Sequence, residues 1–193
     1  MFEVLLESLH QKVTLTPDQE KLCKNFFKHK TLRKRQFLLQ QDEQCHYLAF
    51  VESGVLRSYF SNEKGYEHIL QFAFSGWWIS DMNSLMTGQP SMLNIEALED
   101  SELLLLTKDN YDQLLKEVPA MERYFRLLTL NAMIALQRRL IASMSQNAEE
   151  KYTNLLQTFP LIFQNVPQHM IASYLGITAE TLSRIRKQIA TRK

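Results

Sequence analysis

The residues best suited to chemistry lie near the C-terminal end of the sequence, on either side of Gly176. After this glycine, carboxylate, hydroxyl and guanidinium groups recur at a spacing that places them on one side of a helix. Arginine can donate two hydrogen bonds to guanine and glutamate can accept one from cytosine, so such a side suits the major groove of DNA. The residues expected to contact bases or phosphates are Gln168, His169, Thr178, Ala179, Glu180, Thr181, Ser183, Arg184, Arg186 and Lys187.

Two short helices joined by a tight turn would hold these side chains in place. Pro167 can open the first helix, Gly176 permits a left-handed turn residue, and Thr178 is a favourable N-cap for the second helix. The pattern predicts a helix–turn–helix, with an ordinary helical hairpin as the alternative. The residues expected on the inner side are Ile171, Ala172, Leu175, Ile177, Leu182, Ile185 and Ile189.

The charge distribution agrees with an anionic partner for this end of the chain. The net charge is only +1, yet Thr178 to Lys193 carries five basic residues and one acidic residue. The rest of the chain therefore holds 17 basic and 20 acidic residues. A basic segment on a slightly acidic body favours binding to nucleic acid, while a solvated terminal helix is the alternative. The basic residues are Arg184, Arg186, Lys187, Arg192 and Lys193.

The middle of the sequence predicts antiparallel β-structure. From Lys30 to Thr107, short runs rich in β-formers alternate with turns that contain glycine, which is typical of a sandwich or barrel. Residues 1–30 and the segment Lys108 to Val118 are predicted to be helical, with Thr16 and Pro17 starting one helix. The predicted strands are residues 37–39, 47–51, 55–60, 68–74 and 103–106.

A long helix is predicted after Pro119. Residues 120–146 contain neither glycine nor proline, and a helix of this length would extend for ~40 Å. Its apolar residues occupy more than one face, so two sides must be covered. One side can pack on the β domain and the other on a second subunit, whereas burial within one subunit is the alternative. The row expected in the dimer helix is Met121, Phe125, Leu128, Ala132, Ala135 and Ala142.

These features together resemble the Crp–Fnr family of bacterial transcription regulators over nearly the whole chain. The resemblance implies an α+β protein with an N-terminal antiparallel β-roll of the cyclic-nucleotide-binding type. It implies a sensor domain at residues 1–118, a dimerisation helix at 119–146 and a helix–turn–helix domain at 147–193. Family members commonly continue into a β-hairpin wing, and because the sequence stops at Lys193 we expect a domain without a full wing.

The resemblance also implies partners. Glu180, Ser183 and Arg184 look like the Glu-x-x-Ser-Arg signature of the Fnr branch, which reads a half-site similar to TTGA. The implied partners are double-stranded DNA with a palindromic operator, a second copy of the chain, RNA polymerase and an unknown small-molecule effector, with no membrane. The alternative function is a small-molecule or cyclic-nucleotide sensor that acts through protein–protein contacts.

The stretch from Gly76 to Leu93 departs from the phosphate cassette of cyclic-nucleotide binders. That cassette has Gly-Glu-Leu and then, after a glycine, Arg-Ser or Arg-Ala; here the acid is shortened to Asp81 and the arginine is replaced by Ser91. A buried phosphodiester would lose a charge-assisted pair, so a cyclic nucleotide is disfavoured as ligand in the usual mode. The residues of the expected effector pocket are Gly76, Trp78, Asp81, Met82, Ser91 and Met92.

Other classes of function are excluded by what the sequence lacks. Two cysteines, Cys23 and Cys45, are too few for a four-cysteine iron–sulfur cluster or a disulfide scaffold, and the five histidines show no metal-ligand spacing. There is no nucleophile elbow, zinc-protease motif or glycine-rich phosphate loop, so we expect neither catalytic nor metal-binding residues. Without a signal peptide or a long apolar run, we expect a cytoplasmic protein.

Overall fold

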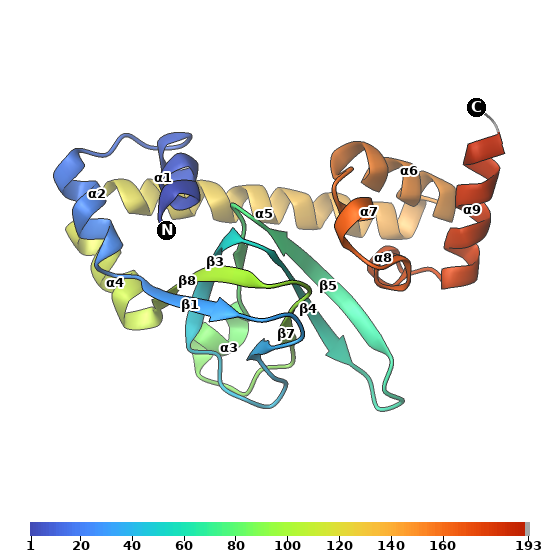
Figure 1. Ribbon diagram of the computed structural model, residues 1–193, viewed down its shortest axis with the longest axis horizontal. Coiled ribbons are helices and arrows are strands. Elements are labelled where there is room, and N and C mark those ends of the chain that lie inside the picture. The colour runs from blue at the N-terminus through green and yellow to red at the C-terminus, as the bar shows by residue number, and fades with distance from the viewer. Residues whose placement is uncertain (192–193) are drawn as a thin grey trace. The chain divides into compact units, whose positions relative to one another are not determined.

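The computed structural model describes residues 1–191, which divide into two compact units. Unit 1 comprises Met1–Phe60 and Gln71–Asn131, and unit 2 comprises Ser61–Leu70 and Ala132–Lys193. Arg192 and Lys193, which belong to the predicted basic segment, lie outside the described residues. Each unit is considered by itself below (Figure 1).

Unit 1 is built on two four-stranded sheets, whose strand pairings are antiparallel. This confirms the predicted antiparallel β-roll. The first sheet has the order β1 (Lys28–Leu32), β8 (Ser101–Thr107), β3 (Tyr47–Ser53) and β6 (Trp78–Ile79). The second has the order β2 (Phe37–Leu39), β7 (Asn94–Ala97), β4 (Val55–Ser61) and β5 (Glu67–Phe74).

Helices pack on the first sheet, which explains the run of four buried leucines in its inner strand β8. Leu103 to Leu106 of β8 are all buried, because β8 lies between β1 and β3 while α4 (Lys108–Glu117) packs against it. Helix α1 (Glu3–His10) packs on β3, where the Glu52 carboxylate accepts a hydrogen bond from the Leu5 N–H at 2.8 Å. A strand buried on both faces loses the alternation of an ordinary antiparallel strand.

The N-terminal region contains more than helices. Helix α2 (Pro17–Lys24) begins with the expected Thr16 N-cap, and Gln19 completes a capping box. The prediction that residues 1–30 are helical is wrong for the last of them, because β1 begins at Lys28. This strand lies at the edge of its sheet and is exposed except at Leu32, so its sequence shows no apolar alternation.

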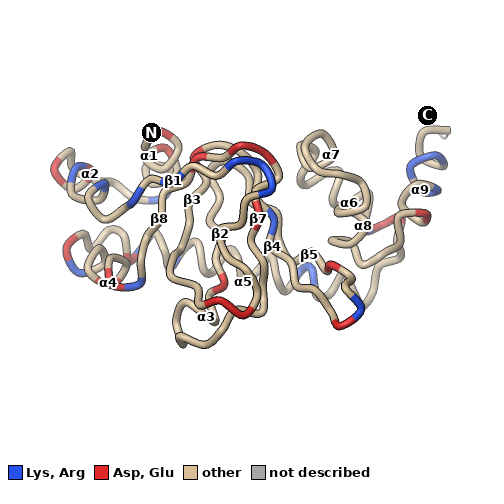
Figure 2. Tube along the Cα trace, turned by 60° about the horizontal axis from the view of Figure 1, so that its bottom comes forward, with Lys and Arg blue, Asp and Glu red and all other residues tan. Residues whose placement is uncertain are grey.

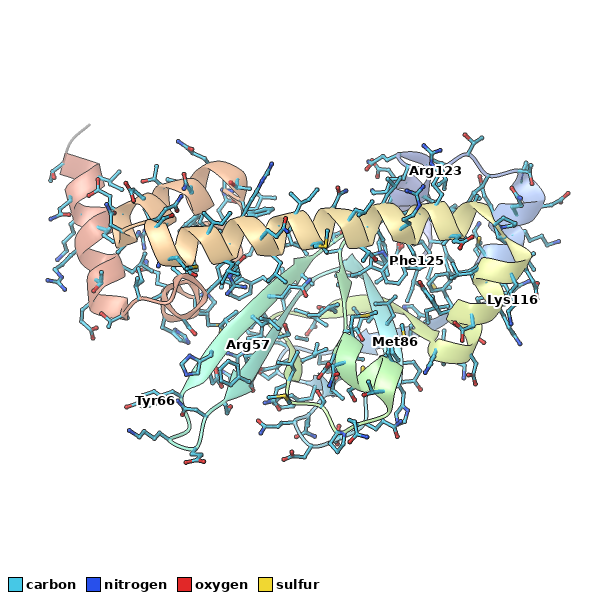
Figure 3. The ribbon with its side chains drawn as sticks, turned by 180° about the vertical axis from the view of Figure 1, so that it is seen from behind. Arg57, Tyr66, Met86, Lys116, Arg123 and Phe125 are labelled. Carbon is cyan, nitrogen blue, oxygen red and sulfur yellow. The ribbon has the colours of Figure 1, made fainter. Side chains whose placement is uncertain are left out.

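Helix α5 (Ala120–Ser145) begins inside the core of unit 1. The buried Tyr124 hydroxyl accepts a hydrogen bond from Trp78 Nε1 at 3.0 Å and lies 2.9 Å from Ser8 Oγ. Figure 3 shows Phe125 directed toward the strands and Arg123 directed away from them. These contacts tie α1, β6 and α5 together. A short helix, α3 (Met82–Thr87), precedes β7.

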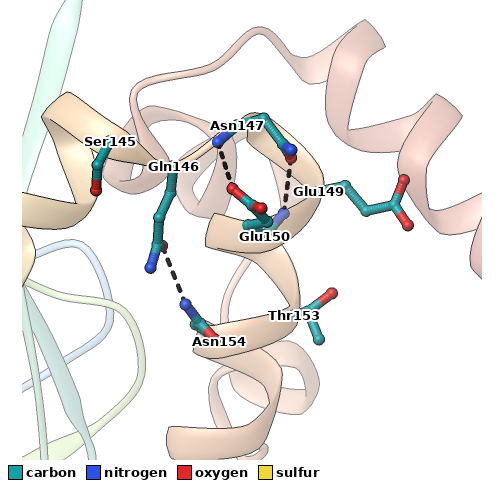
Figure 4. Close-up of a pocket in the computed structure, with 7 residues that line it drawn as sticks. All are labelled: Ser145, Gln146, Asn147, Glu149, Glu150, Thr153 and Asn154. Carbon is teal, nitrogen blue, oxygen red and sulfur yellow. Dashed lines mark hydrogen bonds between the residues drawn. The ribbon is translucent and has the colours of Figure 1, made fainter.

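Unit 2 contains the tip of the β4–β5 hairpin and a group of C-terminal helices. Asn147 and Glu150 form a capping box at the start of the first of these helices, beside a polar groove of about 680 Å³ (Figure 4). The helices are α6 (Ala148–Thr158), α7 (Ile162–Asn165), α8 (Gln168–Leu175) and α9 (Ala179–Thr191). Their core contains Tyr152, Leu155, Ile162, Val166, Ile171, Ala172, Leu182 and Ile185.

Among the described residues, no helix combines the length and the hydropathy that a bilayer span requires.

Candidate nucleic-acid interface

The turn between α8 and α9 has the geometry predicted for a helix–turn–helix. Gly176 has a φ of +69°, in the left-handed region that glycine adopts without strain. Its N–H donates to Ser173 O at 3.0 Å, and the Ile177 N–H donates to Ala172 O at 3.0 Å. These bonds end α8 and redirect the chain into α9.

Thr178 caps α9 and thereby sets which of its faces is outward. Its hydroxyl oxygen accepts a hydrogen bond from the Thr181 N–H at 3.2 Å. Leu182 and Ile185 are buried against the neighbouring helices, since α6 and α8 both pack on α9. The outward face is therefore the one that carries the charged and hydroxyl groups. Its exposed residues are Ala179, Glu180, Ser183, Arg184 and Lys187, while Thr181 is half-buried.

Two groups of opposite charge lie on the first turns of this face. The pKa of Glu180 is lowered by a hydrogen bond from its own backbone N–H, by one from Thr178 and by the charge of Arg184. The carboxylate is therefore ionised at neutral pH and acts only as an acceptor. The Arg184 guanidinium donates to Thr181 Oγ1 at 3.4 Å, which leaves most of its donors directed to solvent.

A shallow groove of about 320 Å³ separates the start of α8 from the middle of α9. Arg186 and Lys187 supply two cations to it, and Gln168 supplies an amide. Figure 2 shows basic positions along α9 and acidic colour near the beginning of the helix. His169 is exposed but is not among the residues that line this groove. The groove residues are Gln168, Ser183, Arg186, Lys187 and Ala190.

In unit 1, two residues of the expected effector pocket lie together but bind each other. The Ser91 hydroxyl donates to Asp81 Oδ2 at 2.7 Å, and Asp81 Oδ1 accepts from the Ser84 N–H at 3.1 Å as the N-cap of α3. Both side chains are buried. The carboxylate that resembles a ribose-binding acid is thus engaged in holding α3 and the following loop.

The other four residues of that set have different surroundings. Trp78 lies in an aromatic cluster, with ring centroids 5.1 Å from Phe50 and 5.3 Å from Phe125. Gly76 occupies the turn between β5 and β6 with a φ of +86°. Met82 and Met92 are exposed.

Within residues 1–191, no three histidine, cysteine, aspartate or glutamate side chains are grouped so that they could hold a metal ion. Cys23 and Cys45 are buried free thiols. Desolvation by burial, with a contribution from the Glu20 charge, raises the pKa of Cys23 to about 11, so this thiol stays protonated at neutral pH.

Comparison with known proteins identifies the β-roll and the regulators that share it. The model of the cyclic nucleotide-binding domain family matches residues 29–118. The chain is 25% identical over 167 residues to the fumarate and nitrate reduction regulatory protein of Vibrio cholerae, covering 81% of this chain and 66% of that protein. It is 24% identical over 181 residues to the cyclic AMP receptor protein of Thermus thermophilus, covering 91% and 83% respectively. The chain is therefore similar to regulators of the kind that the sequence resemblance to the Crp–Fnr family indicated.

A solved structure shares the fold. FixK2 from Bradyrhizobium japonicum superposes with a TM-score of 0.72 at 21% sequence identity, covering 86% of this chain and 85% of that one. The chain spans about two thirds of the length of the Vibrio cholerae relative, since it covers 66% of it.

The structure places the residues of the expected dimer row of α5 in different surroundings. Met121 and Phe125 are buried in the core of unit 1, which leaves these two little surface for a second subunit, and Leu128 is partly buried against that core. Ala132 and Ala135 are exposed, and Ala142 is half-buried. Four large apolar side chains of α5 outside the expected row are exposed at spacings of three and four residues. These residues are Met133, Leu136, Leu140 and Met144.

Proposed function

We propose that this protein is a sequence-specific, DNA-binding regulator of transcription of the Crp–Fnr family, not an enzyme. The observation that carries the proposal is the outward face of α9, where Glu180, Ser183 and Arg184 are exposed on a helix held from behind by buried Leu182 and Ile185. A capped helix that presents a guanidinium and an ionised carboxylate one turn apart is suited to the major groove. The fumarate and nitrate reduction regulatory protein, which the chain resembles, is itself named as a regulator.

Base contacts and phosphate contacts divide between different residues of this face. Arg184 would donate to guanine O6 and N7, Glu180 would accept from cytosine N4, and Ser183 would contact a neighbouring base. The groove lined by Arg186 and Lys187 would receive a phosphate. Thr178, Ala179, Thr181, Gln168 and His169 complete the proposed contact set.

The proposed protein acts as a homodimer on a palindromic operator. The exposed row Met133, Leu136, Leu140 and Met144 on α5 offers an apolar seam to the same helix of a second copy. Two copies of α9 would then enter successive major grooves about 34 Å apart. RNA polymerase is the further partner that transcription regulation requires.

The β-roll is proposed to sense an effector other than a cyclic nucleotide bound in the usual mode. The hydrogen bonds of Ser91 and Ser84 to Asp81 leave this buried carboxylate engaged, and Ser91 supplies no positive charge for a phosphodiester. Addition of millimolar cyclic AMP is expected to leave the melting temperature unchanged. A rise that saturates with concentration would contradict this part of the proposal.

The decisive experiment measures binding to selected DNA. Palindromes would be selected from random duplexes by the wild-type protein, and the affinities of two variants would then be compared on the selected and on random DNA. Arg184→Ala should lose about 10- to 100-fold on the selected palindrome because a bidentate base contact is lost, with little change on random DNA. Lys187→Ala should weaken both to a similar extent and lower the salt dependence.

An equal loss for Arg184→Ala on both duplexes would reduce this residue to a phosphate contact. If the wild-type protein bound no duplex in a salt-dependent manner, the regulator proposal would fail in favour of a sensor that acts through protein contacts.

A further inference from the structure

The tip of the β4–β5 hairpin, residues Ser61–Leu70, lies in unit 2 together with the C-terminal helices. Strand β5 is the outermost strand of its sheet, so one edge of its backbone has no neighbouring strand. Helix α8 meets this edge, although Ile69 and Ser173 are 104 positions apart in the sequence.

A single serine satisfies two backbone groups of this edge. The Ile69 N–H donates to Ser173 Oγ at 3.1 Å, and the Ser173 hydroxyl donates to Glu67 O at 2.8 Å. The hydroxyl therefore replaces the donor and the acceptor that an adjacent strand would supply. Because both bonds depend on one side chain, α8 has one defined position along the strand.

An arginine from α5 also binds backbone groups of this segment. The Arg139 guanidinium donates to the carbonyls of Leu70 and Ile69, the latter at 3.2 Å, and to Tyr174 O at 3.2 Å. It also stacks on the Tyr174 ring, with Cζ 4.2 Å from the centroid. The planar guanidinium of this α5 residue thus contacts both β5 and α8. We call Arg139, Ser173, Tyr174 and residues Glu67–Leu70 the hairpin clasp.

The position of α8 determines the position of α9, the helix proposed to enter the major groove. Only a short turn around Gly176 and Ile177 separates α8 from α9. The two helices pack together, and each contributes a buried residue, Ala172 from α8 and Leu182 from α9. We propose that Arg139 is a positioning residue for DNA recognition: through the hairpin clasp it fixes the orientation of α9, so that a dimer accepts one spacing of half-sites. This inference rests on the proposed function.

The spacing between half-sites is the property that such a clasp controls. One added base pair moves a half-site by about 3.4 Å and rotates it by roughly 35° about the DNA axis. A recognition helix in a fixed orientation loses contacts on the altered operator, whereas a loosely held helix can follow the displaced half-site. A loose helix also occupies the productive orientation for only part of the time, which lowers its affinity for the best operator.

The test uses the full-length protein and three operators that share the same half-sites. One operator has the selected spacer, one is a base pair shorter and one is a base pair longer. Arg139→Met and Ser173→Ala should each lose about 3- to 30-fold on the selected spacer. Their preference for that spacer over the other two should fall several-fold, while affinity for random DNA stays unchanged. Ser173→Ala removes a single oxygen atom, so it provides the test if Arg139→Met fails to fold.

The matched control is Arg138→Met, which removes the same charge from the adjacent exposed position of α5. It should keep the spacer preference of the wild type. Hydrogen exchange at the Ile69 amide should accelerate in Ser173→Ala, because the hydroxyl that protects this amide is gone.

Three results would overturn the inference while the proposed function stands. The first is that Arg139→Met and Ser173→Ala both keep the spacer preference of the wild type. The second is that both variants lose affinity equally on all operators and on random DNA and have lower melting temperatures, which would show a merely structural role. The third is that Arg138→Met behaves as Arg139→Met does. Failure of the wild-type protein to bind any duplex is a different result, because it removes the proposed function itself.

Discussion

Shortening Leu140 should weaken the proposed dimer by an amount that the exposure of this side chain allows us to calculate. Leu140 is 61% exposed in the single chain. Full burial of a leucine side chain is worth about 1.5–3 kcal/mol, so burial of the exposed part in a subunit interface would contribute about 1–2 kcal/mol. A symmetric dimer contains the substitution twice, which raises the loss for Leu140→Ala to about 2–4 kcal/mol. At 1.4 kcal/mol per factor of ten, the dimer Kd should rise about 30- to 700-fold.

Sedimentation equilibrium over a range of protein concentrations measures this Kd directly. The matched control is Leu161→Ala, which removes the same atoms from a leucine that is 60% exposed but lies outside α5. The control should leave the Kd unchanged, and Leu140→Asp should give monomers at concentrations where Leu140→Ala still pairs. The reasoning is refuted if Leu140→Ala dimerises as the wild type does, or if Leu161→Ala weakens the dimer equally.

Three further predictions concern unit 1, each measured by urea unfolding. Tyr124→Phe leaves the partly buried Trp78 Nε1 without its acceptor and should lower the free energy of unfolding by about 1–3 kcal/mol. Tyr66→Phe, at a residue 65% exposed, should change it little, and equal stability of both variants would contradict the role of the buried Tyr124 hydroxyl. Ser91→Ala removes the hydroxyl that donates to buried Asp81 and should cost about 1–3 kcal/mol, whereas no loss would show that this bond does not hold the α3 loop. The pKa of Cys23 rises from its ordinary 9.0 to about 11 in the folded state, so the unfolded chain releases its proton first and stability should fall as pH rises from 9 to 11. Cys23→Ala should show a smaller fall over this interval, and identical pH profiles would contradict the assignment.

The helix–turn–helix was the part of the structure that sequence reasoning predicted best, because its determinants are local. Gly176 and Thr178 define the turn and the cap within three residues, and the apolar spacing in α8 and α9 points to the buried side. Each preference concerns neighbouring residues, so no distant partner is needed to interpret it.

Strands that depend on a distant partner were less predictable. The polar sequence of β1 becomes a strand only through its pairing with β8, in which Lys28 faces Leu105 and Leu32 faces Ser101. The two-residue strand β6 likewise exists through its pairing with β3. Neither carries an alternating pattern long enough to be distinguished from a loop.

The long helix shows that the sequence can predict an element without predicting the surroundings of each face. Its sequence is apolar on several sides, and periodicity alone does not say which side meets the β-roll. The structure commits Met121 and Phe125 to the core of unit 1, and the larger side chains of Leu136 and Leu140 remain exposed. The division follows from the position of the sheet, which is a property of the folded chain as a whole.

The hairpin clasp illustrates the same limit at the level of function. Ser173 lies on a short helix whose sequence predicts only an inner apolar side, so a serine there reads as an ordinary surface residue. Its importance comes from the open edge of β5, where the Ile69 N–H and the Glu67 carbonyl require partners. Arg139 likewise reads as one of two adjacent arginines on a helix, Arg138 being the other. The two arginines differ only in their surroundings. The Arg139 guanidinium donates to three backbone carbonyls, whereas Arg138 is exposed. Arg138→Met and Arg139→Met each remove one positive charge, but only Arg139→Met removes the contacts of the hairpin clasp. A comparison of the two variants therefore separates the effect of charge on the spacer preference from the effect of these contacts.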